Sequence, residues 1–421
     1  MQIFKFGGAS VKDAQGVKNL VNVIQTVGYD NTLVIVSAMG KTTNALEGVI
    51  DNYLNNVKEL QSSIQEVKKF HNAILLDLFD HDSYRDENHP VFKAIDNLFE
   101  ELNAFFSRNK SPDYNFVYDQ VVGFGELAST TIISNYLDVL GIKNNLLDAR
   151  NFIKTDSYYR NATVDWDATQ ERISKKVNTS VLNLSQGFIG SDKNNFSTTL
   201  GREGSDYTAA IFAYCLNAES VTIWKDVPGV LNADPRYFEN TQLLHKISYR
   251  EAIELAFYGA SVIHPKTLQP LQRKEIPLFV KSFKNPKEKG TLVGKGIDLE
   301  PNIPCFIVKK NQVLISLSSL DFSFIVEENI SHIFQLLHLY KMKVDVIQNS
   351  AISFSVCVDN NYDNLDELLL HLKAKFKVDF FNNVSLYTIR HYNSQVIKSL
   401  EKDKTILLKQ IYQETVQIVT K

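Results

Sequence analysis

The first 300 residues alternate short apolar runs with longer segments of helical periodicity. Runs rich in β-branched and aromatic residues lie at 2–6, 32–38, 181–184, 221–224 and 277–281, and amphipathic helical patterns lie at 14–26, 45–57, 64–78 and 91–106. Strands separated by helices favour a mainly parallel sheet, because parallel neighbours need a crossover connection. The pattern therefore predicts an α/β fold with helices packed against a mainly parallel sheet.

The pattern changes near residue 300. Residues 284–304 are rich in Lys, Gly and Pro and lack periodicity, which predicts a linker or a domain edge. Beyond them, strands are predicted at 313–317, 344–348, 352–358, 385–390 and 416–419, and helices at 330–340, 365–376 and 394–415. This order is typical of two small ferredoxin-like α+β units. We predict one domain at 1–300 and another at 301–421; spacing alone leaves open whether the second binds a small ligand, mediates dimerisation or caps the first.

Composition narrows the function classes. With Lys+Arg 45, Asp+Glu 48 and a net charge of -3, the chain lacks the basic excess typical of proteins that bind nucleic acid. No apolar run approaches the roughly 20 residues needed to span a bilayer, and we expect no secretory signal. The three cysteines are widely spaced and form no CxxC pair, so we expect no disulfide framework and no cysteine-based zinc site. The nine histidines show no close metal-ligand spacing, so we expect no metal bound by histidines of the protein. We expect a soluble, cytoplasmic protein.

Two segments imitate known nucleotide-binding motifs. Residues 40–42 read Gly-Lys-Thr after a strand, but a P-loop needs glycine where this chain has Ile35. Residues 123–128 follow the G-x-G-x-x-A pattern of a dinucleotide site, with Asp148 about 20 residues on. Glu126 would stand at the helix start that should bind pyrophosphate, and its negative charge would repel that group. We expect neither a P-loop nor a dinucleotide site, and for residues 123–128 a plain strand–turn–helix connection is the better interpretation.

Two other segments suit anionic ligands better. Lys5 ends a predicted strand and is followed by Gly7 and Gly8, so that backbone N–H groups and a lysine could approach a phosphate; a plain tight turn is the alternative. Residues 199–208 place an arginine, small residues and an aspartate in one turn, which suits carboxylate recognition. Ser205 or Asp206 capping the helix that follows is the alternative there.

Two further segments complete the set of candidates. Residues 224–236 form a turn-rich loop with an early carboxylate and a late arginine, which could hold a nucleotide or could simply be a structured loop fixed by its two prolines. Residues 259–267 close one helix and begin the next, and His264 before proline favours a structural role.

Taken together and in this order, the segments resemble those of the aspartate kinases, in the amino-acid kinase superfamily. The motifs that carry the resemblance are KFGGASV, VSAMGKTTNAL, GFGELAST, QGFIG, TLGREGSDYTA, WKDVPGVLNADPR, GASVIHPKTLQPL and GTLV. The resemblance implies a three-layer α/β/α sandwich followed by two ACT domains. It also implies ATP-dependent phosphorylation of the β-carboxylate of L-aspartate, the first step toward lysine, threonine and methionine, with Mg²⁺ arriving with the nucleotide.

The resemblance assigns roles only to positions that match the family's motifs. Catalysis would fall to Lys5 and Asp206. Contacts to the nucleotide would come from Lys5, Phe6, Gly7, Gly8, Lys225, Asp226, Leu231, Arg236, Ser261 and Val262. Contacts to aspartate would come from Thr43, Glu126, Arg202, Glu203, Gly204 and Ser205, and Glu126 would meet the substrate ammonium.

Some positions depart from the family pattern. Ala9 stands where threonine is usual, Leu231 where an aromatic residue is common near the base, and Ser261 where many members have a lysine that contacts ATP. We hypothesise that Lys225 or Lys266 supplies the missing cation.

The C-terminal part is more diverged. ACT domains imply an effector amino acid, lysine or threonine, and a homodimer or higher homo-oligomer. Another amino-acid kinase, acting on glutamate or acetylglutamate, is one alternative function, and an inactive amino-acid-sensing protein is another.

Overall fold

The computed structural model describes residues 1–79, 89–260, 263–321, 323–360, 364–402 and 404–421. The chain forms two compact units. The first comprises Met1–Val230, Leu243–Ile253 and Val262–Asp298. The second comprises Leu231–Gln242, Glu254–Ser261 and Leu299–Lys421. The second unit therefore includes two short segments that precede residue 300.

The first unit is built on an eight-stranded sheet with the strand order β3-β4-β2-β1-β7-β9-β10-β8. Neighbouring strands from β3 to β9 are parallel, and β10 is antiparallel to β9. The strands are β1 (Gln2–Phe6), β2 (Thr32–Val36), β3 (Asn144–Leu147), β4 (Leu182–Gln186), β7 (Ser220–Lys225), β8 (Lys246–Ser248), β9 (Leu278–Ser282) and β10 (Thr291–Gly294). A separate hairpin is formed by β5 (Ile189–Ser191) and β6 (Ser197–Thr199). The predicted mainly parallel sheet is confirmed.

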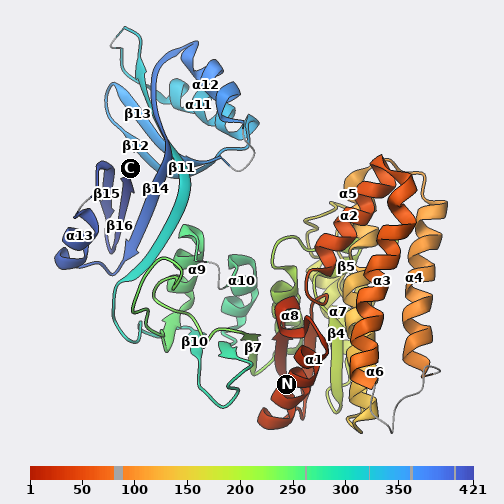
Figure 1. Cartoon of the computed structure of the whole chain (residues 1–421). Coiled ribbons are helices and arrows are strands. Elements are labelled where there is room, and N and C mark those ends of the chain that lie inside the picture. The colour runs from red at the N-terminus through yellow and green to blue at the C-terminus, as the bar shows by residue number, and fades with distance from the viewer. Residues whose placement is uncertain (80–88, 261–262, 322, 361–363, 403) are drawn as a thin grey trace. The chain divides into compact units, whose positions relative to one another are not determined.

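Helices cover both faces of this sheet, which gives three layers. On one face α8 (Gly204–Leu216) packs on β1, β2 and β7, with α7 (Trp166–Lys176) and α10 (Pro265–Lys274) beside it. On the other face α6 (Phe124–Val139) packs on β2, β3 and β4, with α3 (Val57–Phe79) and α4 (Pro90–Arg108) outside it. The other helical segments are η1 (Gly8–Val11), α1 (Ala14–Val27), α2 (Thr42–Asn55), α5 (Tyr114–Val121), η2 (Ala149–Asn151) and α9 (Tyr249–Tyr258). Figure 1 shows α2, α3, α4 and α5 gathered together.

Side-chain alternation along β1 sets up the functional site. Phe4 and Phe6 lie in the apolar core shared with α1, α3 and α6. Because successive side chains of a strand point to opposite faces, Lys5 must face α8. The parallel register of β1 with β2 and with β7 fixes this position in the middle of the sheet.

The second unit is built on one six-stranded antiparallel sheet with the order β12-β13-β11-β14-β16-β15. Its elements are β11 (Cys305–Ser319), α11 (Glu327–Leu339), β12 (Lys343–Asn349), β13 (Ser353–Asp359), α12 (Leu365–Lys373), β14 (Phe376–Arg390), α13 (Ser394–Glu401), β15 (Ile406–Tyr412) and β16 (Thr415–Thr420). The two predicted α+β units are present, but they share the long strands β11 and β14. One core lies under α11 and α12 and another under α13 (Figure 1).

Two predicted segments are corrected. The helix predicted at 394–415 is wrong: α13 ends at Glu401, and β15 pairs with β16 across a turn at 413–414, where Gln413 adopts a left-handed φ of 49°. The segment predicted as a linker at 284–304 contains β10, whose four residues are too few to show periodicity in the sequence. Among the described residues, no helix combines the length and apolar character needed to cross a membrane.

Candidate active site

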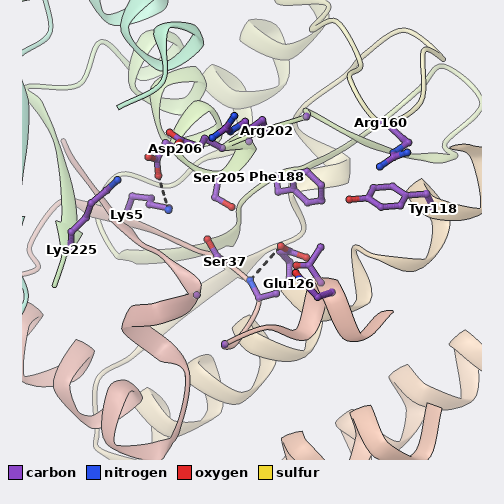
Figure 2. A pocket seen from close by; sticks show the side chains of 18 residues that line it. Lys5, Ser37, Tyr118, Glu126, Arg160, Phe188, Arg202, Ser205, Asp206 and Lys225 are labelled. Atoms are coloured by element: carbon purple, nitrogen blue, oxygen red, sulfur yellow. Dashed lines mark hydrogen bonds and ion pairs between the residues drawn. The ribbon is translucent and has the colours of Figure 1, made fainter. Parts of the chain in front are cut away.

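A cavity of about 650 Å³ opens at the carboxyl ends of β1, β2 and β7, against the start of α8. Carboxyl ends of parallel strands are where ligands commonly bind in α/β folds. The cavity is lined by Lys5, Gly8, Ser37, Ala38, Gly40, Thr43, Asn44, Tyr118, Glu126, Arg160, Phe188, Gly201, Arg202, Glu203, Gly204, Ser205, Asp206 and Lys225. Figure 2 shows this arrangement from close by.

A buried ion pair joins the sheet to α8 in this cavity. The Lys5 ammonium lies 2.6 Å from an Asp206 carboxylate oxygen, and the two side chains are 10% and 3% exposed. A lysine in this environment has lost most of its freedom to move and presents its charge in a fixed place. The pair therefore provides a positioned cation in the cavity, beside Lys225 and away from Tyr118 and Arg160 (Figure 2).

The turn into α8 requires tight packing and unusual backbone geometry. Glu203, directly before the helix, adopts the left-handed region with φ 54°. A Cβ added at Gly187 would lie 2.5 Å from the Ser205 hydroxyl oxygen, so glycine at 187 is needed for Ser205 to sit where it does. The Gly204 N–H donates to the Gly201 carbonyl and the Asp206 N–H to that of Glu203, both at 3.0 Å. The start of a helix carries partial positive charge, which favours an anion at this end.

Glu126, in the first turn of α6, is a deeply buried acid of the cavity. Its side chain is 3% exposed, and one carboxylate oxygen accepts a hydrogen bond from the Ala38 N–H at 3.3 Å. Burial raises the pKa of Glu126 to about 8, although that hydrogen bond and the charge of Lys5 act in the opposite direction. Its other oxygen has no partner in the structure. Such a carboxylate is suited to a cationic ligand, because binding would restore the stabilisation that burial removed.

The loops after β1 and β2 cross closely beside these groups. A Cβ added at Gly8 would lie 2.7 Å from the Ala38 carbonyl oxygen and 2.9 Å from that of Gly40. The Gly40 N–H donates to the Gly8 carbonyl at 3.1 Å. Only glycine at position 8 allows this approach.

The structure brings most of the predicted site residues of the first unit together. Ten of them line the cavity: Lys5, Gly8, Thr43, Glu126, Arg202, Glu203, Gly204, Ser205, Asp206 and Lys225. Gly7 lies beside Lys5, since a Cβ added there would be 3.3 Å from the lysine nitrogen. The Phe6 side chain is fully buried and stacks on Trp224 with ring centroids 6.2 Å apart, which leaves only its backbone for a ligand.

Three of the other predicted nucleotide residues, Asp226, Leu231 and Arg236, are not among the residues that line the cavity. Asp226 is exposed just after β7. Leu231 and Arg236 belong to the second unit, where Arg236 makes a bidentate ion pair with Asp234. Ser261 and Val262 lie outside the described residues.

Of the two lysines proposed to replace the family lysine at 261, only Lys225 lines the cavity. The Lys266 ammonium donates instead to the Asn161 side chain at 2.5 Å and to the Leu200 carbonyl at 3.3 Å. His264 accepts a hydrogen bond from the Lys266 N–H and so caps α10, as the structural interpretation expected. The geometry therefore favours Lys225.

Sequence reasoning did not assign eight of the lining residues: Ser37, Ala38, Gly40, Asn44, Tyr118, Arg160, Phe188 and Gly201. Most of them stand inside motifs that carried the resemblance and could have been included on that ground. Tyr118 and Arg160 stand outside every such motif, and only the fold brings them to the cavity. The Arg160 guanidinium lies over the Tyr118 ring, 4.5 Å from its centroid.

Comparison with known proteins agrees with this geometry. Residues 1–282 match the model of the amino acid kinase family. The chain is 30% identical over 410 residues to lysine-sensitive aspartokinase 3 of Escherichia coli (strain K12), which covers 92% of this chain and 86% of that protein. It is 31% identical over 374 residues to the chloroplastic aspartokinase 1 of Arabidopsis thaliana, covering 85% of this chain and 63% of the relative.

Solved structures show the same similarity. Aspartokinase III of E. coli in complex with lysine and aspartate, in the T-state, superposes with a TM-score of 0.83 at 28% identity, covering 100% of this chain and 95% of the other. The R-state complex of that enzyme with aspartate and ADP gives a TM-score of 0.79 at 27% identity, covering 100% and 96%. The sequence, the fold and the contents of the cavity agree, and the chain belongs to the amino acid kinase family and, within it, to the aspartokinases.

Proposed function

We propose that this protein is an aspartate kinase, which transfers the γ-phosphoryl group of ATP to the β-carboxylate of L-aspartate and yields 4-phospho-L-aspartate and ADP. This would be the first step in the biosynthesis of lysine, threonine and methionine. The observation that carries the proposal is a single cavity holding the Lys5–Asp206 ion pair together with buried Glu126. Relatives that carry the aspartokinase name over nearly the whole chain support it.

The reaction needs positioning and charge neutralisation more than acid–base chemistry. A β-carboxylate is already ionised at neutral pH, so it can attack phosphorus without a general base. Negative charge on the transferring phosphoryl group must be balanced, and the fixed ammonium of Lys5 is placed to do so. Asp206 holds Lys5 in place.

Aspartate has an ammonium and two carboxylates, and the cavity has matching groups. Glu126 would bind the ammonium, and its raised pKa means that this binding is accompanied by loss of a proton near neutral pH. Arg202 and Ser205, at the start of α8, would hold the carboxylates, assisted by the partial positive charge of that helix end.

Lys225 and the glycine loop after β1 would bind the phosphates of ATP. Mg²⁺ usually needs only one or two protein carboxylates when phosphates and water complete its shell. Among the described residues no group of three or more His, Cys, Asp or Glu could form a closed metal site. The cavity carboxylates Asp206 and Glu203 suit an ion that arrives with the nucleotide, where it would neutralise phosphate charge.

The rest of the assignment rests on the resemblance to the aspartate kinases given in the sequence analysis. We propose that residues 1–300 form the catalytic domain and 301–421 the regulatory ACT domains, that an effector amino acid acts through the latter, and that the protein is cytoplasmic. Lysine is the first effector to test, because the E. coli relative is named lysine-sensitive. The antiparallel sheet of the second unit would support a homodimer or a higher oligomer.

A coupled ADP-release assay with Mg-ATP tests the proposal. We expect turnover with L-aspartate and none with L-glutamate, and we expect lysine or threonine to inhibit. If aspartate supported no turnover but aspartate or lysine still raised the melting temperature, the amino-acid-sensing alternative would replace the kinase.

A further inference from the structure

A second buried carboxylate, Asp119 of α5, lies beside the cavity without lining it. Its side chain is fully buried, and the residue before it, Tyr118, does line the cavity. Asp119 is not among the residues to which a role in catalysis or binding was assigned above.

Asp119 accepts hydrogen bonds from three donors on two other segments of the chain. The Arg160 N–H is shared between its two oxygens, at 3.0 and 3.1 Å. The Thr199 N–H donates to one oxygen and the Thr199 hydroxyl to the other, both at 2.8 Å. One carboxylate therefore ties α5 to the loop that contains Arg160 and to the end of β6.

Two features of its surroundings act on the charge of Asp119 in opposite directions. Burial disfavours the ionised carboxylate, whereas the three donors that surround it need an acceptor and so favour the ionised form. Burial raises the pKa of Asp119 to about 6, while the hydrogen bonds from Thr199 and Arg160 lower it. At neutral pH the group is thus mainly ionised. A buried ion is costly unless it is fully hydrogen-bonded, and here the donors meet that requirement.

Both tethered segments lead directly into the cavity. Arg160 lines it, and its backbone has a left-handed φ of 68° that the hydrogen bond to Asp119 helps to hold. Thr199 stands three residues before Arg202, at the entrance to the turn that precedes α8. Figure 2 shows Arg160 beside Tyr118 at the edge of the pocket.

We propose that Asp119 is a positioning residue of the aspartate-binding side of the cavity, acting through Arg160 and through the Arg202–Ser205 turn. This inference rests on the proposed function. It extends the site to a residue that does not line the cavity, and it assigns Arg160, which does line it, to the aspartate-binding side.

An isosteric substitution separates this role from simple packing. In Asp119→Asn the volume is kept, but one oxygen becomes an NH₂ group. In one orientation the amide NH₂ group faces the Thr199 N–H, donor against donor. In the other it replaces the oxygen that accepts from the Thr199 hydroxyl, and the Arg160 N–H keeps only its longer hydrogen bond. Either orientation therefore weakens the tether, because the ionic acceptor that served all three donors is lost.

The matched control is Asp113→Ala, on the same helix. Asp113 caps the start of α5 by accepting a hydrogen bond from the Asn115 N–H at 2.9 Å. This bond involves neither the Arg160 loop nor the end of β6. Its loss destabilises α5 and should lower the melting temperature by a few degrees without altering the cavity. Thr199→Val removes only the hydroxyl donor to Asp119 and leaves the backbone hydrogen bonds, so it should weaken the tether less than Asp119→Asn does.

The experiment measures KM for aspartate and for ATP in full-length wild type and variants. We expect Asp119→Asn to raise the aspartate KM about tenfold or more with the ATP KM within about twofold, and Thr199→Val to raise the aspartate KM about threefold. Asp113→Ala should leave both constants unchanged.

An unchanged aspartate KM in Asp119→Asn, or an equal rise in Asp113→Ala, would overturn the inference. If Asp119→Asn does not fold, Thr199→Val decides by the same comparison. A wild type without turnover would contradict the proposed function instead, and the aspartate Kd from calorimetry would then replace KM in these comparisons.

Discussion

Glu126→Gln should make the protein more stable at alkaline pH while it impairs function. In the folded protein the pKa of Glu126 is raised from 4.5 to about 8, with burial as the main cause. Between these two values the unfolded chain has lost a proton that the folded protein keeps. The free energy of unfolding that protonated Glu126 contributes is fully present below pH 4.5, the pKa in the unfolded chain. It falls as pH rises and is lost once pH exceeds the pKa in the folded protein.

The size of the effect follows from the shift. Each pKa unit corresponds to about 1.4 kcal/mol, so ionised Glu126 costs about 5 kcal/mol of unfolding free energy above pH 8, of which about 2 kcal/mol is lost between pH 6 and 8. Glutamine at 126 keeps the shape and can still accept from the Ala38 N–H, but it does not ionise. The variant should therefore lack this part of the pH dependence. It should also raise the aspartate KM about tenfold or more, because the charge that would bind the substrate ammonium is gone.

Urea unfolding of wild type and variant at pH 6, 7, 8 and 9, without substrate, measures the first effect. Glu171→Gln on α7, which removes an exposed carboxylate, is the matched control and should follow the wild type. Parallel pH profiles for wild type and Glu126→Gln would refute the reasoning. So would a variant that binds aspartate as tightly as the wild type.

Three further predictions concern the cavity. Lys5→Met should lower kcat about 100-fold or more in the ADP-release assay, because the positioned cation is lost. Lys225→Ala should raise the ATP KM about tenfold while Lys266→Ala leaves it within about twofold, and equal effects would show that cavity lining does not identify the phosphate-binding lysine. Gly187→Ala should displace Ser205, which would raise the aspartate KM and lower the free energy of unfolding by about 1–3 kcal/mol in denaturation; unchanged values would contradict the tight packing.

The parts of the fold that could be predicted are those whose local sequence alone determines the element. The apolar runs of β1 and β2 are buried on both faces, and their bounds were predicted within two residues. The strand β15 was missed because its register comes from pairing with β16, which the local pattern of residues 406–412 does not encode. Strand β10 was missed because its four residues are too few to show periodicity, and its pairing with β8 and β9 is not visible in the local sequence.

The site likewise contains residues that the sequence reveals and residues that only the fold brings together. Lys5 and Asp206 could be found because they stand in segments whose residue types already suggest ion binding, whereas Glu126 was assigned only through the resemblance to the aspartate kinases. The pairing of Lys5 with Asp206 could not be derived from spacing, since the two are separated by 201 positions and meet only through the packing of α8 on β1. Arg160 had no signal in the sequence, because its place depends on the hydrogen bond from its backbone to Asp119.

Direct detection of the product tests the central claim most directly. An acyl phosphate reacts with hydroxylamine to give a hydroxamate, so incubation with Mg-ATP, L-aspartate and hydroxylamine should yield aspartyl hydroxamate and ADP in equal amounts. The account predicts this product from the wild type and its near absence from Lys5→Met, with none when glutamate replaces aspartate. ADP formed without hydroxamate, or hydroxamate formed equally well by Lys5→Met, would contradict it.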